Sequence, residues 1–253
     1  MEVNMPIAFA NFLSNGFIGD YFLNNQSDKN ALIFMIIGAV IVGICAYLLG
    51  SINFAIIISG KKFKEDIRSH GSKNAGMTNM MRTYGKRAAG LTLAGDALKA
   101  VVACLIGYAL IGQPGAYVAG LFCMLGHVFP IFYGFKGGKG VVTAFATVLM
   151  CDPHILPLLL LIFVIIVAFT KFISLGSIMC MLLYPLLLDR ITRIITGETS
   201  PYIIFTVLIA VIIFIKHWEN VKRLLNGTEN KFSFKKKARP ATENAEEIKD
   251  KEN

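Results

Sequence analysis

The chain has 253 residues, of which 55% are hydrophobic and 16% are charged. This composition is too apolar for an ordinary soluble domain and indicates a protein that crosses a membrane several times. The net charge of +9 does not indicate a nucleic-acid-binding protein, because the basic residues fall in loops and in a tail and form no patch on a folded polar domain.

Residues 1–30 contain one lysine and no basic segment that would begin a cleavable signal peptide, so we expect an extension that is either interfacial or disordered. Seven apolar segments follow, at about 31–59, 88–111, 116–133, 141–150, 155–170, 172–188 and 202–215. Short turns between several of them suit reversal between antiparallel helices. The sequence therefore predicts an all-α, polytopic integral membrane bundle of about seven transmembrane helices over residues 31–227.

The basic residues also predict the orientation of this bundle. With seven spans, the loops and tail on one side carry 21 Lys and Arg residues, and those on the other side carry 3. Because loops rich in Lys and Arg stay in the cytoplasm, we expect the amino terminus outside and the carboxyl terminus in the cytoplasm. Residues 228–253 are expected to form a basic, charged and largely disordered cytoplasmic tail that is able to contact anionic membrane lipids.

Two charged residues fall inside the second apolar segment. Asp96 and Lys99 lie three positions apart, which places them on one face of a helix. Since an isolated charge is costly in lipid, we interpret them as a mutual pair with a structural role near the inner leaflet.

The stretch from Gly134 to Gly140 contains four glycines and two lysines, Lys136 and Lys139. Glycine lets the backbone approach a ligand closely, and the lysines add positive charge, so this composition is typical of a phosphate site. A flexible turn between membrane helices, with lysines at the lipid headgroups, is the alternative. The stretch is not a nucleotide P-loop, because Gly140 stands where that motif requires Ser or Thr.

A second polar stretch covers residues 68–82 and has almost no acidic side chain. Its neutral hydrogen-bonding groups are Ser72, Asn74, Thr78 and Asn79. Arg82 adds a planar guanidinium that can bind a phosphate through two hydrogen bonds. A loop that only touches lipid phosphates would need lysines but not so many amides, so we favour a binding site.

A third polar stretch begins with His217 at the end of the last apolar segment. If the helix continues, His217 and Asn220 form a pair three residues apart on one face. A single histidine at a membrane boundary is often only interfacial, but here two other polar stretches are predicted to lie at the same depth.

Together these stretches offer Ser, Arg, Lys, His, Asn and glycine backbone, with no metal cluster and no carboxylate pair. They suit a phosphorylated, anionic ligand that is bound without a metal or other cofactor. CDP-alcohol transfer is disfavoured, because it requires an aspartate-rich metal site. The sequence also lacks the His-x-x-x-x-Asp arrangement of the common glycerolipid acyltransferases.

Residues 71–79 with Arg82, residues 126–140 and residues 217–229 resemble the bacterial acyl-phosphate:glycerol-3-phosphate acyltransferases, the PlsY family. The resemblance extends over about residues 48–229. It implies a multi-pass enzyme of the bacterial inner membrane with its active site on the cytoplasmic face. It further implies transfer of a fatty acyl group from acyl phosphate to the 1-hydroxyl of glycerol 3-phosphate, giving lysophosphatidate and phosphate, the first committed step of phospholipid synthesis.

The resemblance also implies roles for individual residues. The implied catalytic residues are Ser72, Arg82, Lys139, His217 and Asn220. The glycines at 137, 138 and 140 match the acyl-phosphate cradle, Ser177 matches a substrate contact, and Glu229 matches an acidic residue of structural importance. Lys73 departs from the family, which usually has Gly at this position. The alternative functions are a transporter or channel for a phosphorylated anion and a structural membrane protein.

Overall fold

The computed structural model describes residues 15–17, 19 and 28–232. The expectations for most of the amino-terminal extension and for the tail beyond Phe232 lie outside these residues. Within the described part every regular element is helical, as predicted.

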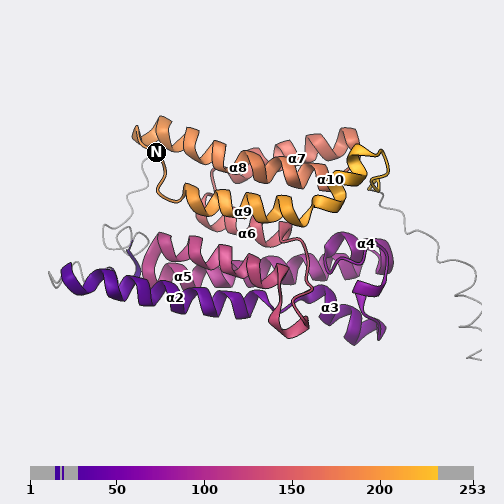
Figure 1. The fold of residues 1–253 in the computed structure, drawn as a ribbon, viewed down its shortest axis with the longest axis horizontal. Coiled ribbons are helices and arrows are strands. Elements are labelled where there is room, and N and C mark those ends of the chain that lie inside the picture. Colours follow the sequence, from indigo (N-terminus) through magenta and orange to yellow (C-terminus); the bar gives the residue numbers. More distant parts are fainter. Residues whose placement is uncertain (1–14, 18, 20–27, 233–253) are drawn as a thin grey trace, which may run out of the picture.

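The main helices run side by side along the long axis of the molecule (Figure 1). They are α2 (Asp28–Gly50), α5 (Lys86–Val128), α6 (Val141–Cys151), α7 (Leu156–Thr170), α8 (Ile173–Thr196) and α9 (Ile203–Lys216). The short helices α3 (Phe54–Ile58), α4 (Met77–Tyr84) and α10 (Trp218–Leu225) lie together at one end of the bundle. Short single turns occur at Ser59–Phe63, Ile67–Ser69 and Ile131–Tyr133.

Helix α5 folds back on itself and forms two antiparallel arms, residues 86–110 and 113–128. The backbone is non-helical at Ile111 and Gly112, where the chain reverses. The arms approach so closely that a Cβ added at Gly107 would lie 2.2 Å from the carbonyl oxygen of Gly115. The predicted reversal at 112–115 is therefore present, shifted by about one residue because Pro114 fits into the first turn of the second arm.

The predicted membrane segments agree with the helices only in part. The segment expected at 31–59 is not one helix, because α2 ends at Gly50 and the side chain of Asn53 caps α3 by accepting a hydrogen bond from the amide of Ile56 at 3.1 Å. Two stretches, Leu32–Phe63 and Lys86–Tyr133, are long and apolar enough to span a membrane, and a third qualifies if α9 and α10, which are bent by 58°, count as one span. The total of seven spans stays a prediction.

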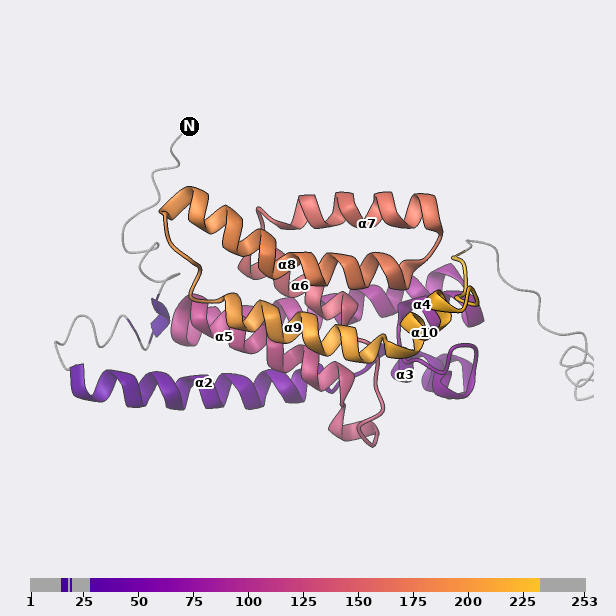
Figure 2. The ribbon, with the colours of Figure 1, turned by 45° about the horizontal axis from the view of Figure 1, so that its top comes forward.

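The three polar stretches lie together at one end of the bundle, which we call the loop end and define by residues 59–85, 129–140 and 217–230 (Figure 2). The reversal of α5 and the turns at 152–155 and 197–202 lie at the opposite end. Large apolar side chains such as Ile33, Leu98 and Val164 are more than half exposed on the outer helix faces. In a bilayer such apolar faces contact lipid.

Candidate active site

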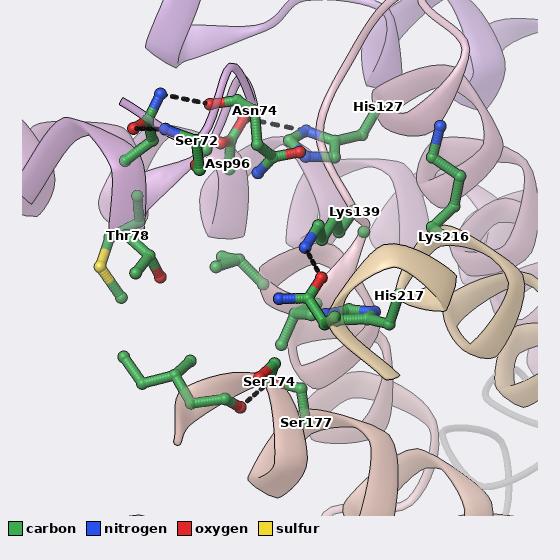
Figure 3. Close-up of a pocket in the computed structure, with 18 of the residues that line it drawn as sticks. Ser72, Asn74, Thr78, Asp96, His127, Lys139, Ser174, Ser177, Lys216 and His217 are labelled. Carbon is green, nitrogen blue, oxygen red and sulfur yellow. Dashed lines mark hydrogen bonds and ion pairs between the residues drawn. The ribbon is translucent and has the colours of Figure 1, made fainter. Parts of the chain in front are cut away.

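A pocket of about 1000 Å³ opens at the loop end, where all three polar stretches meet (Figure 3). Nearly every residue predicted for the site lines this pocket: Ser72, Asn74, Thr78, Asn79, Arg82, Asp96, Lys136, Gly137, Lys139, Gly140, Ser177, His217, Asn220 and Glu229. Gly138 is the one predicted site residue that is absent from its lining.

Asn79 on α4 holds the first polar stretch in shape. Its side-chain oxygen accepts a hydrogen bond from the Ser72 amide at 3.0 Å, and its side-chain nitrogen donates to the carbonyl oxygens of His70 at 2.9 Å and Asn74 at 3.1 Å. The carboxamide is thus occupied by the loop backbone, and the residue is only 1% exposed. In the structure the Asn79 side chain therefore stabilises the loop conformation, whereas the sequence analysis interpreted Asn79 as a substrate-binding residue.

Ser72 and Arg82 present free polar groups to the pocket. Neither the Ser72 hydroxyl nor the Arg82 guanidinium forms a hydrogen bond or ion pair with any residue in the described part of the chain. Burial lowers the pKa of Arg82, and the nearby Glu229 carboxylate acts in the opposite direction. Arg82 therefore enters the pocket as a cation whose donors are available to a phosphate.

Lys73 occupies a backbone conformation that favours glycine. Its φ angle is +57°, in the left-handed region that costs a residue with a Cβ about 1 kcal/mol. The glycine that the family resemblance implies at this position would adopt this conformation without strain.

We expect Lys73→Gly to raise the free energy of unfolding by about 0.5–1 kcal/mol, because glycine removes the strain at this φ. Thermal unfolding in detergent measures the change. Lys73→Ala is the matched control, since it removes the charge and keeps the strain. If Lys73→Gly and Lys73→Ala had equal free energies of unfolding, backbone strain at this position would not be what lowers the stability of the wild-type protein.

The glycine loop packs against the end of α5 and does not offer a ring of free amides. The amides of Gly137 and Gly138 donate to the carbonyl oxygens of Val128 at 3.3 Å and His127 at 3.1 Å. A Cβ at Gly137 would lie 2.0 Å from the His127 carbonyl oxygen, and one at Gly138 would lie 2.1 Å from His127 Nε2. These glycines are needed for close packing, and their amides are already paired with backbone carbonyls in this structure.

The first turn of α6 offers amides in their place. Gly140 precedes this helix with a φ of +83° and provides no side-chain cap, and Val141 and Val142 line the pocket together with Gly140. The amino terminus of a helix has unpaired amides and a positive partial charge, and both favour an anion.

Lys139 is linked to the third polar stretch by hydrogen bonds. Its Nζ donates to Asn220 Oδ1, and Asn220 Nδ2 donates to Glu229 Oε1 at 2.7 Å. Burial lowers the pKa of Lys139 to about 8, assisted by the positive charges of Arg223, Arg82 and Lys216 and opposed by Glu229. An anionic ligand would relieve this concentration of positive charge.

His217 lies at a bend, not inside a continuous helix. Helix α9 ends at Lys216 and α10 begins at Trp218, so the condition on which the pair with Asn220 was predicted does not hold. The two side chains nevertheless line the same pocket. His217 Nδ1 lies 2.8 Å from the carbonyl oxygen of Ile213, and burial together with Lys139 lowers the pKa of His217 to about 4. The imidazole is therefore neutral at pH 7, with Nδ1 as the donor and Nε2 as an acceptor.

The sequence analysis gave no site role to several polar residues that line the pocket. Lys216 lines it, and its Nζ lies 4.9 Å from the centre of the Phe129 ring. Arg68 donates through Nη1 to the carbonyl oxygens of Tyr133 at 2.8 Å and Lys136 at 3.1 Å, which connects two loops. Ser174 donates to Glu229 Oε1 at 2.8 Å, whereas the hydroxyl of Ser177, the predicted substrate contact, donates to the carbonyl oxygen of Ile173 in its own helix. Arg68 is the first residue of the second polar stretch and Lys216 directly precedes the third, and these positions were the available signal.

The other half of the pocket is apolar and runs between α5, α6 and α7. Its lining includes Leu93, Val101, Phe145, Leu149, Leu160 and Phe163. An alkyl chain can lie against such side chains while a phosphate stays at the basic end. The arrangement suits a ligand that joins an anionic head to a long apolar chain.

The chain is similar to known proteins over most of its length. Residues 40–227 match the family described as glycerol-3-phosphate acyltransferase. Proteins of this name from Finegoldia magna, Thermoanaerobacter pseudethanolicus and Trichlorobacter lovleyi are 38%, 41% and 42% identical to it. The matches cover 76%, 78% and 74% of this chain and 95%, 97% and 94% of the relatives.

The fold is similar to two crystal structures of PlsY (YgiH), an integral membrane glycerol 3-phosphate acyltransferase. One is the glycerol 3-phosphate form, with a TM-score of 0.70, and the other is the lysophosphatidic acid form, with a TM-score of 0.67. Each is 34% identical in sequence, and the matches cover 77% and 78% of this chain and 96% of each solved chain.

Proposed function

The chain belongs to the glycerol-3-phosphate acyltransferase family, and we propose that it transfers a fatty acyl group from acyl phosphate to the 1-hydroxyl of glycerol 3-phosphate. The products are lysophosphatidate and phosphate. The main support for the proposal is that Lys139, Arg82 and the first turn of α6 line the same pocket as the apolar side chains of α5, α6 and α7. Two phosphorylated substrates, one of them with an alkyl chain, fit this division.

The proposed reaction is a direct transfer. The substrate hydroxyl oxygen forms a bond to the acyl carbon, the bond from that carbon to the bridging phosphate oxygen breaks, and phosphate leaves. Acyl phosphate carries a good leaving group, so positioning and compensation of negative charge by Lys139 and Arg82 supply most of the rate. Ser72 then binds or orients substrate and forms no acyl-enzyme, and a covalent acyl group trapped on Ser72 would contradict this role.

The hydroxyl proton has two acceptors in this proposal. His217 is neutral at pH 7 and has Nε2 available, but its pKa of about 4 makes it a weak base in the unliganded enzyme. A bound phosphate raises this pKa by its negative charge. A phosphate oxygen of the substrate is the other acceptor.

The pKa of Lys139 predicts an alkaline limit to activity. Because this pKa is lowered to about 8, the amine loses its charge as the pH rises through 8, and we expect kcat/KM to fall there. Rates of lysophosphatidate formation between pH 7 and 10 measure this fall in kcat/KM. In Lys139→Arg the residual activity should fall only at higher pH, because a guanidinium stays charged. If kcat/KM of Lys139→Arg fell at the same pH as that of the wild-type protein, the decrease would be due to a group other than Lys139.

We further propose that the protein lies in the bacterial inner membrane with its loop end in the cytoplasm. The support is the excess of Lys and Arg in the loops and tail assigned to that end. This places the pocket on the side where glycerol 3-phosphate is available, with membrane lipids around the helices. A cysteine introduced at Lys62 should react with a membrane-impermeant maleimide only after intact cells are permeabilised.

The decisive experiment incubates the purified protein with acyl phosphate and glycerol 3-phosphate and measures lysophosphatidate and free phosphate. Stoichiometric formation of both supports the transferase. Protein in sealed vesicles that moves a phosphorylated anion but forms no product would support the transporter alternative. Absence of product with well-folded protein would contradict the proposal.

A further inference from the structure

A buried cluster of three ionisable side chains lies directly behind the glycine loop. Lys99 Nζ is 2.9 Å from Asp96 Oδ1 and 3.1 Å from His127 Nδ1, and His127 Nδ1 is 3.4 Å from Asp96 Oδ1. The three side chains are 2%, 2% and 5% exposed. Figure 3 shows Asp96 and His127 among the residues that line the pocket, which Lys139 also lines. The mechanism described above uses none of the three.

Lys99 connects this cluster to the end of α2. Its Nζ donates to the carbonyl oxygens of Gly50 at 2.8 Å and Ile52 at 2.6 Å. These carbonyls lie at the end of α2, where carbonyl oxygens lack partners within the helix. A buried ammonium requires a nearby counter-ion, and Asp96 provides it. Lys99 Nζ is thus within hydrogen-bonding distance of two carbonyl oxygens and of His127 Nδ1, and Asp96 lies beside both Lys99 and His127.

His127 connects the cluster to the glycine loop at two points. Its carbonyl oxygen accepts a hydrogen bond from the Gly138 amide at 3.1 Å. The edge of its ring, at Nε2, occupies the space where a Cβ of residue 138 would lie. The residue after Gly138 is Lys139, so the position of His127 fixes the backbone that carries the phosphate-binding lysine.

We propose that His127, held by Asp96 and Lys99, is a positioning residue that sets the place of Lys139 through Gly138. The inference deepens the proposed function and rests on it. The cluster keeps the glycine loop against α5, so that Lys139 reaches Asn220 and the first turn of α6 before substrate binds. Pre-positioned charge of this kind accelerates a reaction because no reorganisation is needed in the transition state.

His127→Asn tests the proposal, because the asparagine carboxamide can replace Nδ1 as a polar partner of Lys99 and Asp96 but does not reach Gly138. We expect a rise of about tenfold in KM for acyl phosphate and, without substrate, at least fivefold faster hydrogen exchange in residues 131–141. Tyr117→Phe is the matched control. It removes a buried hydrogen bond to Asp152, 2.8 Å long, from the same arm of α5 at the opposite end. It should lower the unfolding temperature without changing KM or loop exchange.

The double variant Asp96→Asn with Lys99→Met separates positioning from folding. Each single change leaves one charge buried without its partner, and the double change removes both charges. We expect the double variant to unfold at a higher temperature than either single variant. We also expect it to show the same faster hydrogen exchange in residues 131–141, and the same raised KM for acyl phosphate, as His127→Asn.

The proposal would be overturned if His127→Asn kept the wild-type KM and the wild-type rate of hydrogen exchange in residues 131–141. It would also be overturned if Tyr117→Phe showed the raised KM and the faster exchange that we expect of His127→Asn. If the wild-type protein formed no lysophosphatidate, the proposed function would fail. The exchange measurements would still decide whether His127 holds the loop.

Discussion

Replacing Lys139 with alanine is expected to lower kcat/KM for acyl phosphate by about a thousandfold, which corresponds to roughly 4 kcal/mol of transition-state stabilisation. Lys139 precedes α6, donates to Asn220 and lies among the buried polar groups of the pocket. Low solvent exposure strengthens its interaction with the charge that develops on the leaving phosphate. Initial rates with labelled glycerol 3-phosphate measure the loss, and circular dichroism establishes that the variant is folded.

A lysine at the same end of the bundle provides the control. Lys62 contacts the Phe63 ring and does not line the pocket, so Lys62→Ala should leave kcat/KM within about twofold of the wild-type value. Lys139→Arg should retain part of the activity, because it keeps a charge in a different shape. A loss of less than tenfold in Lys139→Ala would show that another cation stabilises the phosphate.

The sequence was sufficient to predict the helical class, the convergence of three polar stretches and the pair formed by Asp96 and Lys99. Each of these depends on a local pattern. Apolar length predicts helices in a membrane, and a spacing of three residues puts two side chains on one helix face. The pair is present, with 2.9 Å between Lys99 Nζ and Asp96 Oδ1.

The errors concern partners that are distant in the sequence. Composition identified the glycines at 137 and 138 but could not show that their amides are used by His127 and Val128. His127 itself was recognised only as part of a motif, because its partner Lys99 lies 28 residues away and meets it only after α5 folds back. The bend at His217 was missed because the preceding apolar run gives no local signal for the end of α9.

The second large effect is expected at Glu229, which joins three donors. Oε1 accepts from Asn220 Nδ2 at 2.7 Å and from Ser174 at 2.8 Å, and Oε2 accepts from Arg223 Nε at 2.8 Å. Burial raises the pKa of Glu229, but these hydrogen bonds outweigh it and the net shift is downward. The carboxylate therefore stabilises the fold at neutral pH, and this contribution is lost as the pH falls through the lowered pKa.

We expect Glu229→Ala to lower the free energy of unfolding by about 3 kcal/mol, because a carboxylate whose side chain is only 5% exposed is removed from its partners. Activity should fall by more than a hundredfold at a temperature where the variant is folded, since Asn220 then loses the contact that orients it toward Lys139. Thermal unfolding and the transfer assay measure the two effects.

Two further variants distinguish the network from general effects of removing an acid. Asp189→Ala breaks an exposed pair with Arg193, 2.9 Å long, and should change stability by less than about 0.5 kcal/mol. Glu229→Gln keeps an acceptor for Asn220 and Ser174 but turns an amide donor toward Arg223, so it should retain more stability than alanine while Arg223 loses its anchor. Wild-type activity in Glu229→Gln would show that Lys139 and Asn220 are held without the negative charge, and the role assigned to Glu229 would then reduce to packing.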